Sequence, residues 1–376
     1  MRILFVCGGT GGGAAMSTHE LADALADAGD QVRVVQSARG AEKVHQVQRR
    51  LLNASVKLAR TPLAGVLQWG TGVVGRRTTV ATVPGTREAV KRVTAPVVEN
   101  AVPAALAEFR PDVVVTNSVD RASWRAVWRH AHHARVPVLL YIREESALAH
   151  VDDPQARPDA VVANAAALAD GATARGVPAP FIASVVDLER SRVEPSRERV
   201  VFVNPIELNG LDLAIALAAE CPDVPFTFVE SWRLDDAAVQ ALTSCLAALS
   251  NVRFQRRSDD PRRSYADASV LLAPCLTDTR PRVVLEAQAN GIPVLAADQP
   301  SLREAVGAGG ATVAVDAPAE EWARALGGLL DPAHYDTVCD AARAYAQRDD
   351  ARTEVIVARF RAVLEQTVER GVGGAS

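Results

Sequence analysis

The sequence lacks the features that would draw the chain to a polyanion or into a membrane. Its 376 residues carry a formal net charge of -4, so there is no basic excess of the kind that nucleic-acid-binding proteins show. No stretch reaches the roughly 18 consecutive apolar residues that a membrane-spanning helix needs. We therefore expect no nucleic-acid partner and no integral membrane segment.

Paired cysteines and a leader segment are also missing. The five cysteines are odd in number and far apart, and no two have the spacing of metal ligands. This pattern indicates free thiols in a reducing compartment. An apolar strand is predicted from Arg2 onward, so we expect no signal peptide and a cytoplasmic location.

What is present is an ordinary globular composition in a chain that is too long for one core. Apolar residues make up 48% and charged residues 23% of the sequence. A length of 376 residues favours two domains.

The first half alternates between apolar runs and helical patterns. An apolar run at 2–7 ends in glycines, residues 14–28 place apolar side chains at helical spacing, and 32–35 form the next run. This order is typical of the opening of a doubly wound α/β fold. Further strands are predicted at 112–116 and 136–142, with weaker ones at 159–163 and 180–183. These runs are apolar throughout, as in parallel strands that are covered on both faces.

The second half repeats the alternation after a polar break. Residues 187–199 are charged and contain a proline, which indicates an interdomain linker. A long amphipathic helix is predicted at about 351–370, and its apolar stripe needs a surface to cover. Strands are predicted near 199–204, 225–229, 251–255, 269–273, 292–296 and 311–315.

Residues 40–100 are the least informative part. The stretch 42–60 is basic and has a helical pattern. It either holds a substrate or touches a membrane surface, or it is a solvated helix with an apolar inner stripe.

A glycine-rich loop joins the first strand to the first helix. Glycine permits a close approach of the backbone to a ligand, and a helix start attracts phosphate, so Gly11, Gly12 and Gly13 are candidate ligand contacts. The loop also formally fits a dinucleotide fingerprint, but the second strand lacks the acidic residue that such a site uses for ribose. A tight turn without a ligand is the third interpretation.

The most informative stretch is 278–296, where a strand, a loop and a helix from about Arg282 follow one another. Backbone N–H groups at the helix start, including that of Val283, suit a diphosphate. Asp278 and Glu286 suit sugar or ribose hydroxyls through charge-assisted hydrogen bonds. Arg280 and Arg282 suit phosphate charge.

This stretch resembles the retaining GT-B glycosyltransferases of family 4, also called glycosyl transferases group 1. Their motif is Glu-x7-Glu followed by Ala-x-Ala-x-Gly-x-Pro-Val. Glu286 matches the second Glu, and the first falls on Asp278. The motif's tail is matched by Ala287, Ala289, Gly291, Pro293 and Val294. The resemblance extends over most of the chain except roughly 40–100.

The resemblance implies a fold of two Rossmann-like domains that face a central cleft, with a C-terminal helix that crosses back to the first domain. The expected boundaries are 1–187 plus 350–376 for the acceptor domain, and 188–349 for the nucleotide-sugar domain. The implied activity is transfer of a hexosyl or related group from a nucleotide-sugar to a small acceptor, with retention of anomeric configuration. No cofactor and no metal are implied. A natural product is the expected acceptor, and the oligomeric state is open, with a homodimer as one option.

The implied site departs from the family at its cations. Family members carry a Gly-Arg pair where the first strand of the second half ends in Val203-Asn204-Pro205, and a Lys-Gly pair where this chain has Asn209-Gly210, so both expected charges are missing. We still expect Asn204 and Asn209 beside the donor. A lost cation in a water-poor site costs on the order of several kcal/mol of transition-state stabilisation. Arg143 stands where the family often has a catalytic His, and its alternative role is an ion pair. Candidate replacement cations are Arg280, Arg282, Arg256, Arg257 and Arg233.

Other interpretations stay open from the sequence alone. The lost cations favour a catalytically impaired GT-B protein that binds a nucleotide or a partner, and the glycine loop leaves a nicotinamide oxidoreductase as a third hypothesis. The opening glycines also resemble inverting GT-B enzymes of peptidoglycan lipid synthesis, although the second half does not fit them. His130, His132 and His133 show no third metal ligand, so we expect a surface helix there. Trp124 and Trp128 are expected in the core.

Overall fold

A computed structural model describes residues 1–7, 12–37, 90–95, 97–117 and 120–373. The predicted ligand contact Gly11 and the basic stretch 42–60 lie outside these residues. The chain divides into two compact units. The first comprises Met1–Asn164, Ala169–Ile182 and Thr353–Ser376, and the second comprises Ala165–Leu168 and Ala183–Arg352.

The first unit is built on a parallel sheet of six strands in the order β3-β2-β1-β4-β5-β6. The strand that comes first in the sequence lies in the middle of the sheet, so the chain winds outward twice from the centre, as in dinucleotide-binding folds. The strands are β1 (Arg2–Cys7), β2 (Gln31–Ser37), β3 (Val90–Ala95), β4 (Val113–Thr116), β5 (Val138–Ile142) and β6 (Ala160–Ala163).

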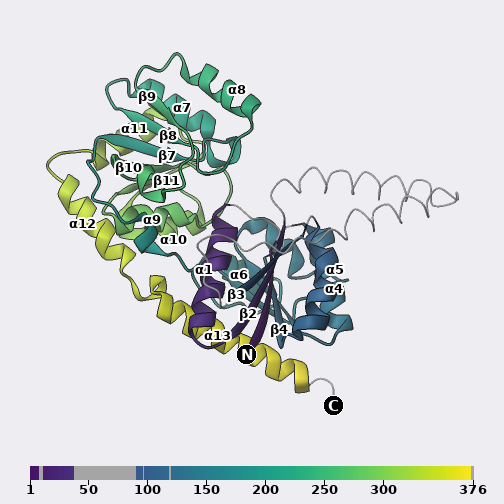
Figure 1. Cartoon of the computed structure of the whole chain (residues 1–376). Coiled ribbons are helices and arrows are strands. Elements are labelled where there is room, and N and C mark those ends of the chain that lie inside the picture. Colours follow the sequence, from purple (N-terminus) through teal and green to yellow (C-terminus); the bar gives the residue numbers. More distant parts are fainter. Residues whose placement is uncertain (8–11, 38–89, 96, 118–119, 374–376) are drawn as a thin grey trace, which may run out of the picture. The chain divides into compact units, whose positions relative to one another are not determined.

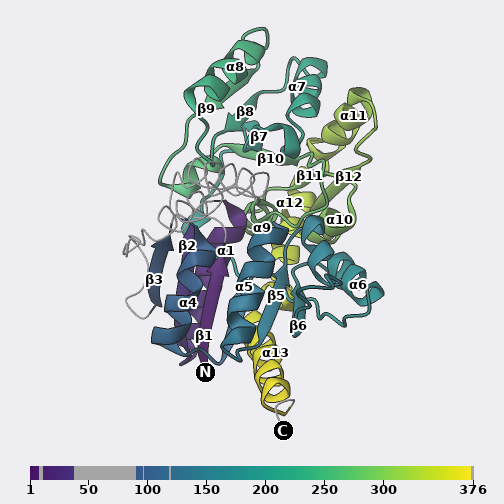
Figure 2. The ribbon, with the colours of Figure 1, turned by 90° about the vertical axis from the view of Figure 1, so that its right-hand side faces the viewer.

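Helices cover both faces of this sheet, which explains why its strands are apolar throughout. Helices α1 (Gly13–Asp27) and α13 (Thr353–Gly373) lie on one side, and α4 (Val98–Phe109) and α5 (Arg121–His133) lie on the other (Figure 1). The view in Figure 2 places α4 and α5 in front of the strands. The remaining helical segments of this part of the chain are η1 (Glu145–His150) and α6 (Ala166–Ala174).

The second unit repeats the same winding. Its parallel sheet has the order β12-β11-β10-β7-β8-β9, again with the earliest strand in the middle. The strands are β7 (Arg199–Val203), β8 (Phe226–Val229), β9 (Val252–Gln255), β10 (Ala268–Ala273), β11 (Val294–Ala297) and β12 (Gly310–Val313).

Two layers of helices enclose the second sheet. Helices α7 and α11 pack together on one face, whereas α9 packs with α10 and α12 on the other (Figure 1). The helices are α7 (Leu211–Glu220), α8 (Asp236–Leu246), α9 (Arg282–Ala289), α10 (Pro300–Val306), α11 (Ala319–Leu329) and α12 (Tyr335–Ala346). Short turns of 3-10 helix are η2 (Leu188–Ser191), η3 (Glu207–Asn209), η4 (Pro261–Ser264), η5 (Gly307–Gly309) and η6 (Asp349–Ala351).

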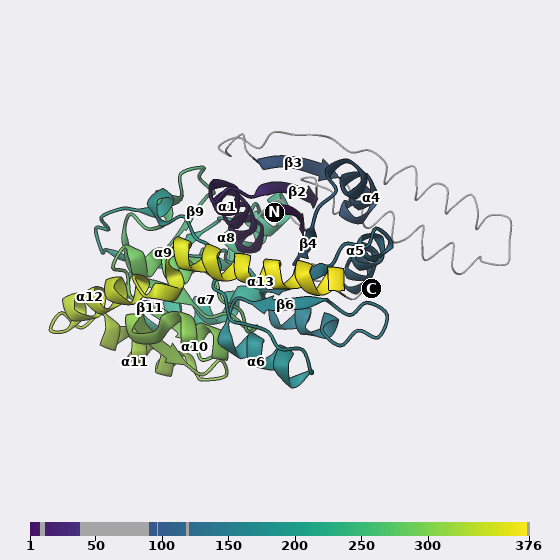
Figure 3. The same ribbon diagram turned by 90° about the horizontal axis from the view of Figure 1, so that it is seen from below.

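The predicted C-terminal helix is confirmed, and the surface that it covers belongs to the first unit. Helix α13 lies beside α1 and β4 (Figure 3). Phe360 and Leu364 are fully buried, and the Phe360 ring lies 5.4 Å from that of Tyr141 at the centroids. An ion pair of 3.1 Å from Arg361 to the buried Asp30 adds a polar contact.

Sequence and structure differ at two strands. The strand predicted at 180–183 is wrong, because the described chain forms only a single bridge there, between Phe181 and Ala163. Strand β3 was not predicted. It lies at the sheet edge and reads Val-Lys-Arg-Val-Thr-Ala, and charged side chains are common on edge strands because they discourage aggregation.

Two further observations concern the whole described chain. None of its helices combines the length and the apolarity that a bilayer crossing requires. The five cysteines are free thiols. Burial raises the pKa of the Cys7 thiol to about 12, although the charges of Arg143 and Arg92 act in the opposite direction. Burial also raises the pKa of the Cys275 thiol to about 11.

Candidate functional site

The winding of the second unit selects one edge of its sheet as the place for a ligand. Strands β7 and β10 are neighbours, and the chain leaves them toward opposite sides of the sheet. In open α/β sheets, ligands bind outside the carboxyl ends of the strands at this switch point. The loops that follow β7 and β10 therefore form the floor of the candidate site.

These two loops are tied together by the backbone. The N–H of Leu276 donates to the carbonyl of Leu208 over 3.0 Å. Gly210 has φ +84°, and a Cβ atom there would lie 2.1 Å from the carbonyl oxygen of Pro274. Only glycine fits this position, so the two loops approach each other as closely as their backbones allow.

Asn204 and Asn209 brace the first of these loops. Asn204 has φ +57°, in the left-handed region, and its Oδ1 accepts hydrogen bonds from the N–H groups of Ser231 (3.0 Å) and Trp232 (2.6 Å). Asn209 donates from Nδ2 to the carbonyl of Asn204 over 2.9 Å. These two uncharged side chains thus hold the loops after β7 and β8 in place.

Helix α9 begins at Arg282, as predicted. Pro281 is its N-cap, and no side chain caps this helix end in the described structure. The first turn of a helix has N–H groups without intrahelical acceptors and a partial positive charge. The N–H of Val283 belongs to this turn, which gives the end of α9 the chemistry of an anion site.

Asp278 lies on the loop after β10 and holds the start of the neighbouring helix α10. Its Oδ1 accepts from the N–H of Ser301, and its Oδ2 accepts from the hydroxyl of the same residue, each over 2.8 Å. Pro300 at the first position of α10 has no N–H, so Ser301 carries the first donor that needs an acceptor. The side chain of Asp278 is half-buried next to the start of α9.

Glu286 is buried on the second turn of α9 and has a partner on each carboxylate oxygen. Arg282 donates from Nε to Oε1 over 2.7 Å, and the hydroxyl of Tyr265 donates to Oε2. Burial raises the pKa of Tyr265 well above its usual value, and the charge of Glu286 and the hydrogen bond to it act in the same direction. The phenol is therefore a neutral donor to a carboxylate.

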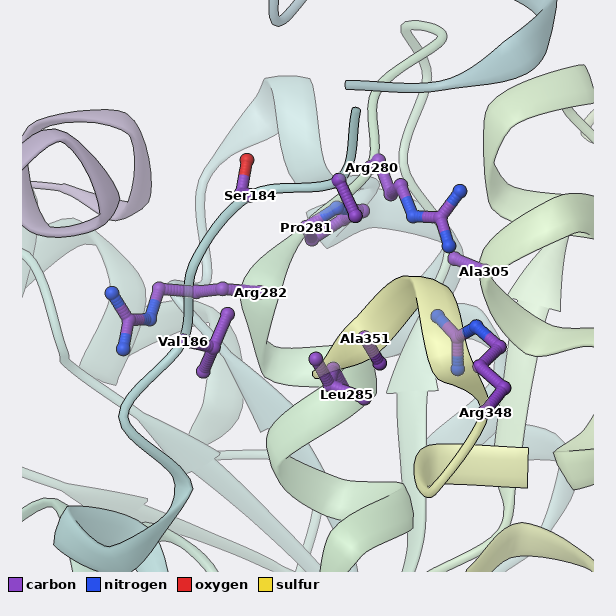
Figure 4. A pocket seen from close by; sticks show the side chains of 10 residues that line it. Ser184, Val186, Arg280, Pro281, Arg282, Leu285, Ala305, Arg348 and Ala351 are labelled. Carbon is purple, nitrogen blue, oxygen red and sulfur yellow. The ribbon is translucent and has the colours of Figure 1, made fainter. Parts of the chain in front are cut away.

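Arg280 lies at a small pocket beside the start of α9. The pocket is lined by parts of residues 183–186, α9 and η6, and its volume of about 20 Å³ is roughly what one water needs. In Figure 4 the side chains of Arg280 and Arg348 point toward Ala305, whereas the side chain of Arg282 points the other way. Arg280 pairs with Glu304 (3.4 Å) and Asp350 (3.8 Å).

The charge of Arg280 is held in a costly environment. Burial lowers its pKa, and the neighbouring Arg348 lowers it further, while Asp350 and Glu304 act in the opposite direction. Arg348 is itself paired with Asp350 over 2.9 Å. Two guanidinium groups thus share two carboxylates next to the start of α9.

Arg256 lies at the end of β9 and pairs with the buried Glu230 at the end of β8. Its Nε donates to Oε2 of Glu230 over 2.7 Å, and the N–H of Arg257 donates to the same oxygen over 3.1 Å. Burial alone would raise the pKa of Glu230, but hydrogen bonds from the N–H groups of Arg257 and Leu234 and from Arg256 lower it. Arg257 also lies 3.7 Å from Asp259, and Arg233 is exposed.

An apolar rim on the same edge was missed by sequence reasoning. Leu208 follows β7, Trp232 follows β8 and Leu276 follows β10, and they are the exposed large hydrophobic side chains of the second unit. Trp232 is 42% exposed. Their positions directly after three adjacent strands were the available signal, because such loops line the ligand edge of the sheet.

The first unit has a second group of candidates at its own carboxyl edge. Helix α1 begins at Gly13, and Gly12 has φ +87°, a conformation that glycine adopts without strain. Arg143, directly after β5, donates from Nη1 to the carbonyl of Ala14 over 2.9 Å and lies 4.4 Å above the ring of Tyr141. Arg143 therefore lies at the start of α1, where the predicted Gly12 and Gly13 are found.

The tryptophan and histidine side chains of α5 make contacts within the first unit. Trp124 is fully buried, as predicted, but the core position predicted for Trp128 is wrong. Trp128 is half-buried and stacks on His132 at 4.0 Å. The Nε2 of His132 lies 2.9 Å from Asp159. Within the described residues, no group of three or more His, Cys, Asp or Glu side chains is arranged to hold a metal ion.

Comparison with known proteins gives one family model and a set of similar structures. The model described as glycosyl transferases group 1 matches residues 198–332, which contain the loops after β7, β8, β9 and β10 and the whole of α9. No curated protein matches this sequence.

Three solved structures illustrate the likeness, each 17% identical to this chain. The alignment with sucrose-phosphate synthase from Thermosynechococcus elongatus covers 100% of both chains and has a TM-score of 0.72. The alignment with HepE from Anabaena, in complex with UDP-glucose, covers 97% of this chain and 100% of HepE and has a TM-score of 0.69. AviGT4, a glycosyltransferase involved in avilamycin A biosynthesis, covers 98% of both with a TM-score of 0.63. The two doubly wound α/β units therefore have the GT-B fold that glycosyltransferases adopt.

Proposed function

We propose that this protein is a glycosyltransferase that moves a hexosyl or related group from a nucleotide-sugar to a small-molecule acceptor with retention of anomeric configuration. The observation that carries the proposal is the carboxyl edge of the second unit. There the segment matched by the family model places the uncapped start of α9, two carboxylates and several arginines at the switch point of the sheet. Among the similar structures, one contains UDP-glucose.

The donor is assigned to this edge by its chemistry. The diphosphate takes the N–H groups at the start of α9, including that of Val283, because this end of the helix favours anions. Glu286 takes ribose hydroxyls, and Asp278 takes sugar hydroxyls. The base is assigned to the ends of β8 and β9, where Trp232 is exposed and Arg256 lies.

The leaving diphosphate needs positive charge that Asn204 and Asn209 do not supply. Arg282 is the first residue of α9 and Arg280 lies two residues before it, and each is paired with a carboxylate of the protein. An ion pair that must be exchanged for a phosphate contact gives less net stabilisation than a cation placed for phosphate alone. We therefore expect slower transfer than in an enzyme with both family cations.

Retention follows from the proposed family and defines the roles of the remaining residues. The acceptor hydroxyl attacks the anomeric carbon from the face that the diphosphate leaves, and the leaving phosphate oxygen takes the hydroxyl proton. Asp278 holds the sugar in this scheme and does not attack it. Arg143 of the first unit is proposed as a contact for the acceptor or for phosphate.

A thermal-shift screen followed by a transfer assay tests the proposal. UDP-, GDP-, ADP- and TDP-sugars are screened first, and a ligand at 100 times its Kd should stabilise the folded protein by about 2.7 kcal/mol. The anomeric configuration of the product is then read from its proton NMR coupling constants. Inversion would contradict the retaining assignment, and the absence of a shift with every nucleotide would contradict the donor site.

One observation favours a second candidate function, a nucleotide-binding protein without transferase activity. The family's two cations are absent at Asn204-Pro205 and at Asn209, and both asparagine side chains form hydrogen bonds with backbone groups. Such a protein would bind nucleoside diphosphates and leave the donor intact. Turnover of a donor at about 1 per second or faster would exclude it.

A further inference from the structure

The carboxylate of Glu286 has two hydrogen-bond partners that differ in their surroundings. Tyr265 precedes β10, is 2% exposed, and reaches Oε2 from the buried side of α9. Arg282 is one turn earlier on the same helix and reaches Oε1 with its Nε over 2.7 Å. The two oxygens are therefore held by separate parts of the chain.

The Tyr265 contact is fixed, because a buried phenol has no water with which to replace its acceptor. Its raised pKa agrees with a hydroxyl that keeps its proton. The Arg282 contact is different, because its side chain begins on the first residue of α9, at the end of the helix that faces the proposed diphosphate. A guanidinium there can exchange one anion for another.

We infer that Tyr265 is a positioning residue that presents Oε1 of Glu286 to the ribose of the donor. This inference rests on the proposed function. Without a ligand, Arg282 neutralises the buried carboxylate, which would otherwise be strongly unfavourable. When the donor binds, the ribose 2′-hydroxyl replaces Arg282 at Oε1, while the Tyr265 hydroxyl stays on Oε2 and keeps the carboxylate from rotating. The hydroxyl of Tyr265 thus contributes to the preference for a ribonucleotide without touching it.

Binding of paired ribo- and 2′-deoxyribonucleotides tests this role. Calorimetric titration with UDP and 2′-deoxy-UDP, and with the same pairs for GDP and ADP, gives a ratio of affinities for each pair. For the pair that binds, we expect the wild type to prefer the ribonucleotide by about tenfold or more, because a hydrogen bond to a charged group is lost in the deoxy form. In Tyr265→Phe the ratio should fall to about threefold or less, mainly through weaker binding of the ribonucleotide.

Tyr335→Phe is the matched control. Its hydroxyl donates to the carbonyl of Ser269 over 2.7 Å in the same unit, so the variant also loses one tyrosine hydrogen bond. It should lose stability in urea as Tyr265→Phe does but keep the wild-type ratio. The double variant Tyr265→Phe/Glu286→Gln adds a second test, because Glu286→Gln alone should already lower the ratio and Tyr265→Phe should then lower it no further.

The outcomes separate the inference from the function on which it rests. If the wild type binds neither these six diphosphates nor TDP, the proposed function fails and the inference fails with it. Binding of TDP alone would overturn the inference and leave the proposed function. If the wild type prefers the ribonucleotide and Tyr265→Phe keeps that preference in full, only the role of Tyr265 is overturned. An equal loss of the ratio in Tyr335→Phe would also overturn it, because the effect would then be a general loss of stability.

Discussion

Substitution of Asp278 by asparagine separates the two roles that this carboxylate can have. In the structure it caps α10 by accepting from the N–H and the hydroxyl of Ser301, each over 2.8 Å. Asp278→Ala removes both bonds and should cost about 2 kcal/mol, half from the lost cap and half from the lost hydroxyl contact. Asp278→Asn keeps an acceptor for the N–H and can donate to the hydroxyl, so it should cost about 0.5 kcal/mol, mainly for the lost charge at the helix start.

Urea unfolding and transfer kinetics then report on different roles. With a denaturant slope of about 2 kcal/mol/M, the midpoint should fall by about 1 M in Asp278→Ala and by about 0.25 M in Asp278→Asn. If the carboxylate also holds sugar hydroxyls, both variants should lose at least about tenfold in kcat/KM, because both lose the charge. Asp235→Ala is the matched control, since Asp235 accepts from the N–H of Ala238 at the start of α8. Full activity in Asp278→Asn would refute the contact with sugar and leave Asp278 as a cap alone.

Three further predictions concern other parts of the two units. Burial and the nearby Arg92 lower the pKa of His19 to about 4, so the folded state favours neutral histidine. Stability should therefore be complete above pH 6.5 and fall by about 2 to 3 kcal/mol as the pH drops from 6.5 to 4, and urea unfolding of His19→Gln should lack this decline. Gly210→Ala should destabilise by clearly more than Gly29→Ala in thermal unfolding, because both have positive φ but only Gly210 would place a Cβ against a backbone carbonyl. Trp232→Ala should weaken binding of the nucleoside diphosphate about tenfold in calorimetry if the base stacks on the exposed ring, and unchanged affinity would place the base elsewhere.

Much of the fold could be predicted because its strands are buried on both faces. Strand β1 has the predicted bounds, and β10 and β7 begin or end within one residue of them. Continuous apolar runs identify such strands from a single sequence. Edge strand β3 was missed because Lys91 and Arg92 interrupt its apolar residues, so it has no such run.

The candidate site was predictable in outline only. The motif spacing located Asp278, Glu286 and the start of α9, because these depend on local sequence. It could not show that Ser301 binds Asp278 or that Tyr265 binds Glu286, since both contacts join residues more than 20 positions apart. Nor could it show that four of the five arginines proposed as replacement cations already have carboxylate partners, because that depends on tertiary packing.

The position of α13 in the first unit sets an order of events during synthesis on the ribosome. Residues 183–352 of the second unit are made before any residue of α13, so that unit can fold while the last helix is still missing. The first unit lacks the side chains of Phe360 and Leu364 in its core until α13 has been synthesised. The half of the chain that is synthesised first is therefore the half that is completed last, and its apolar α13-binding surface must stay exposed meanwhile to water or to a chaperone.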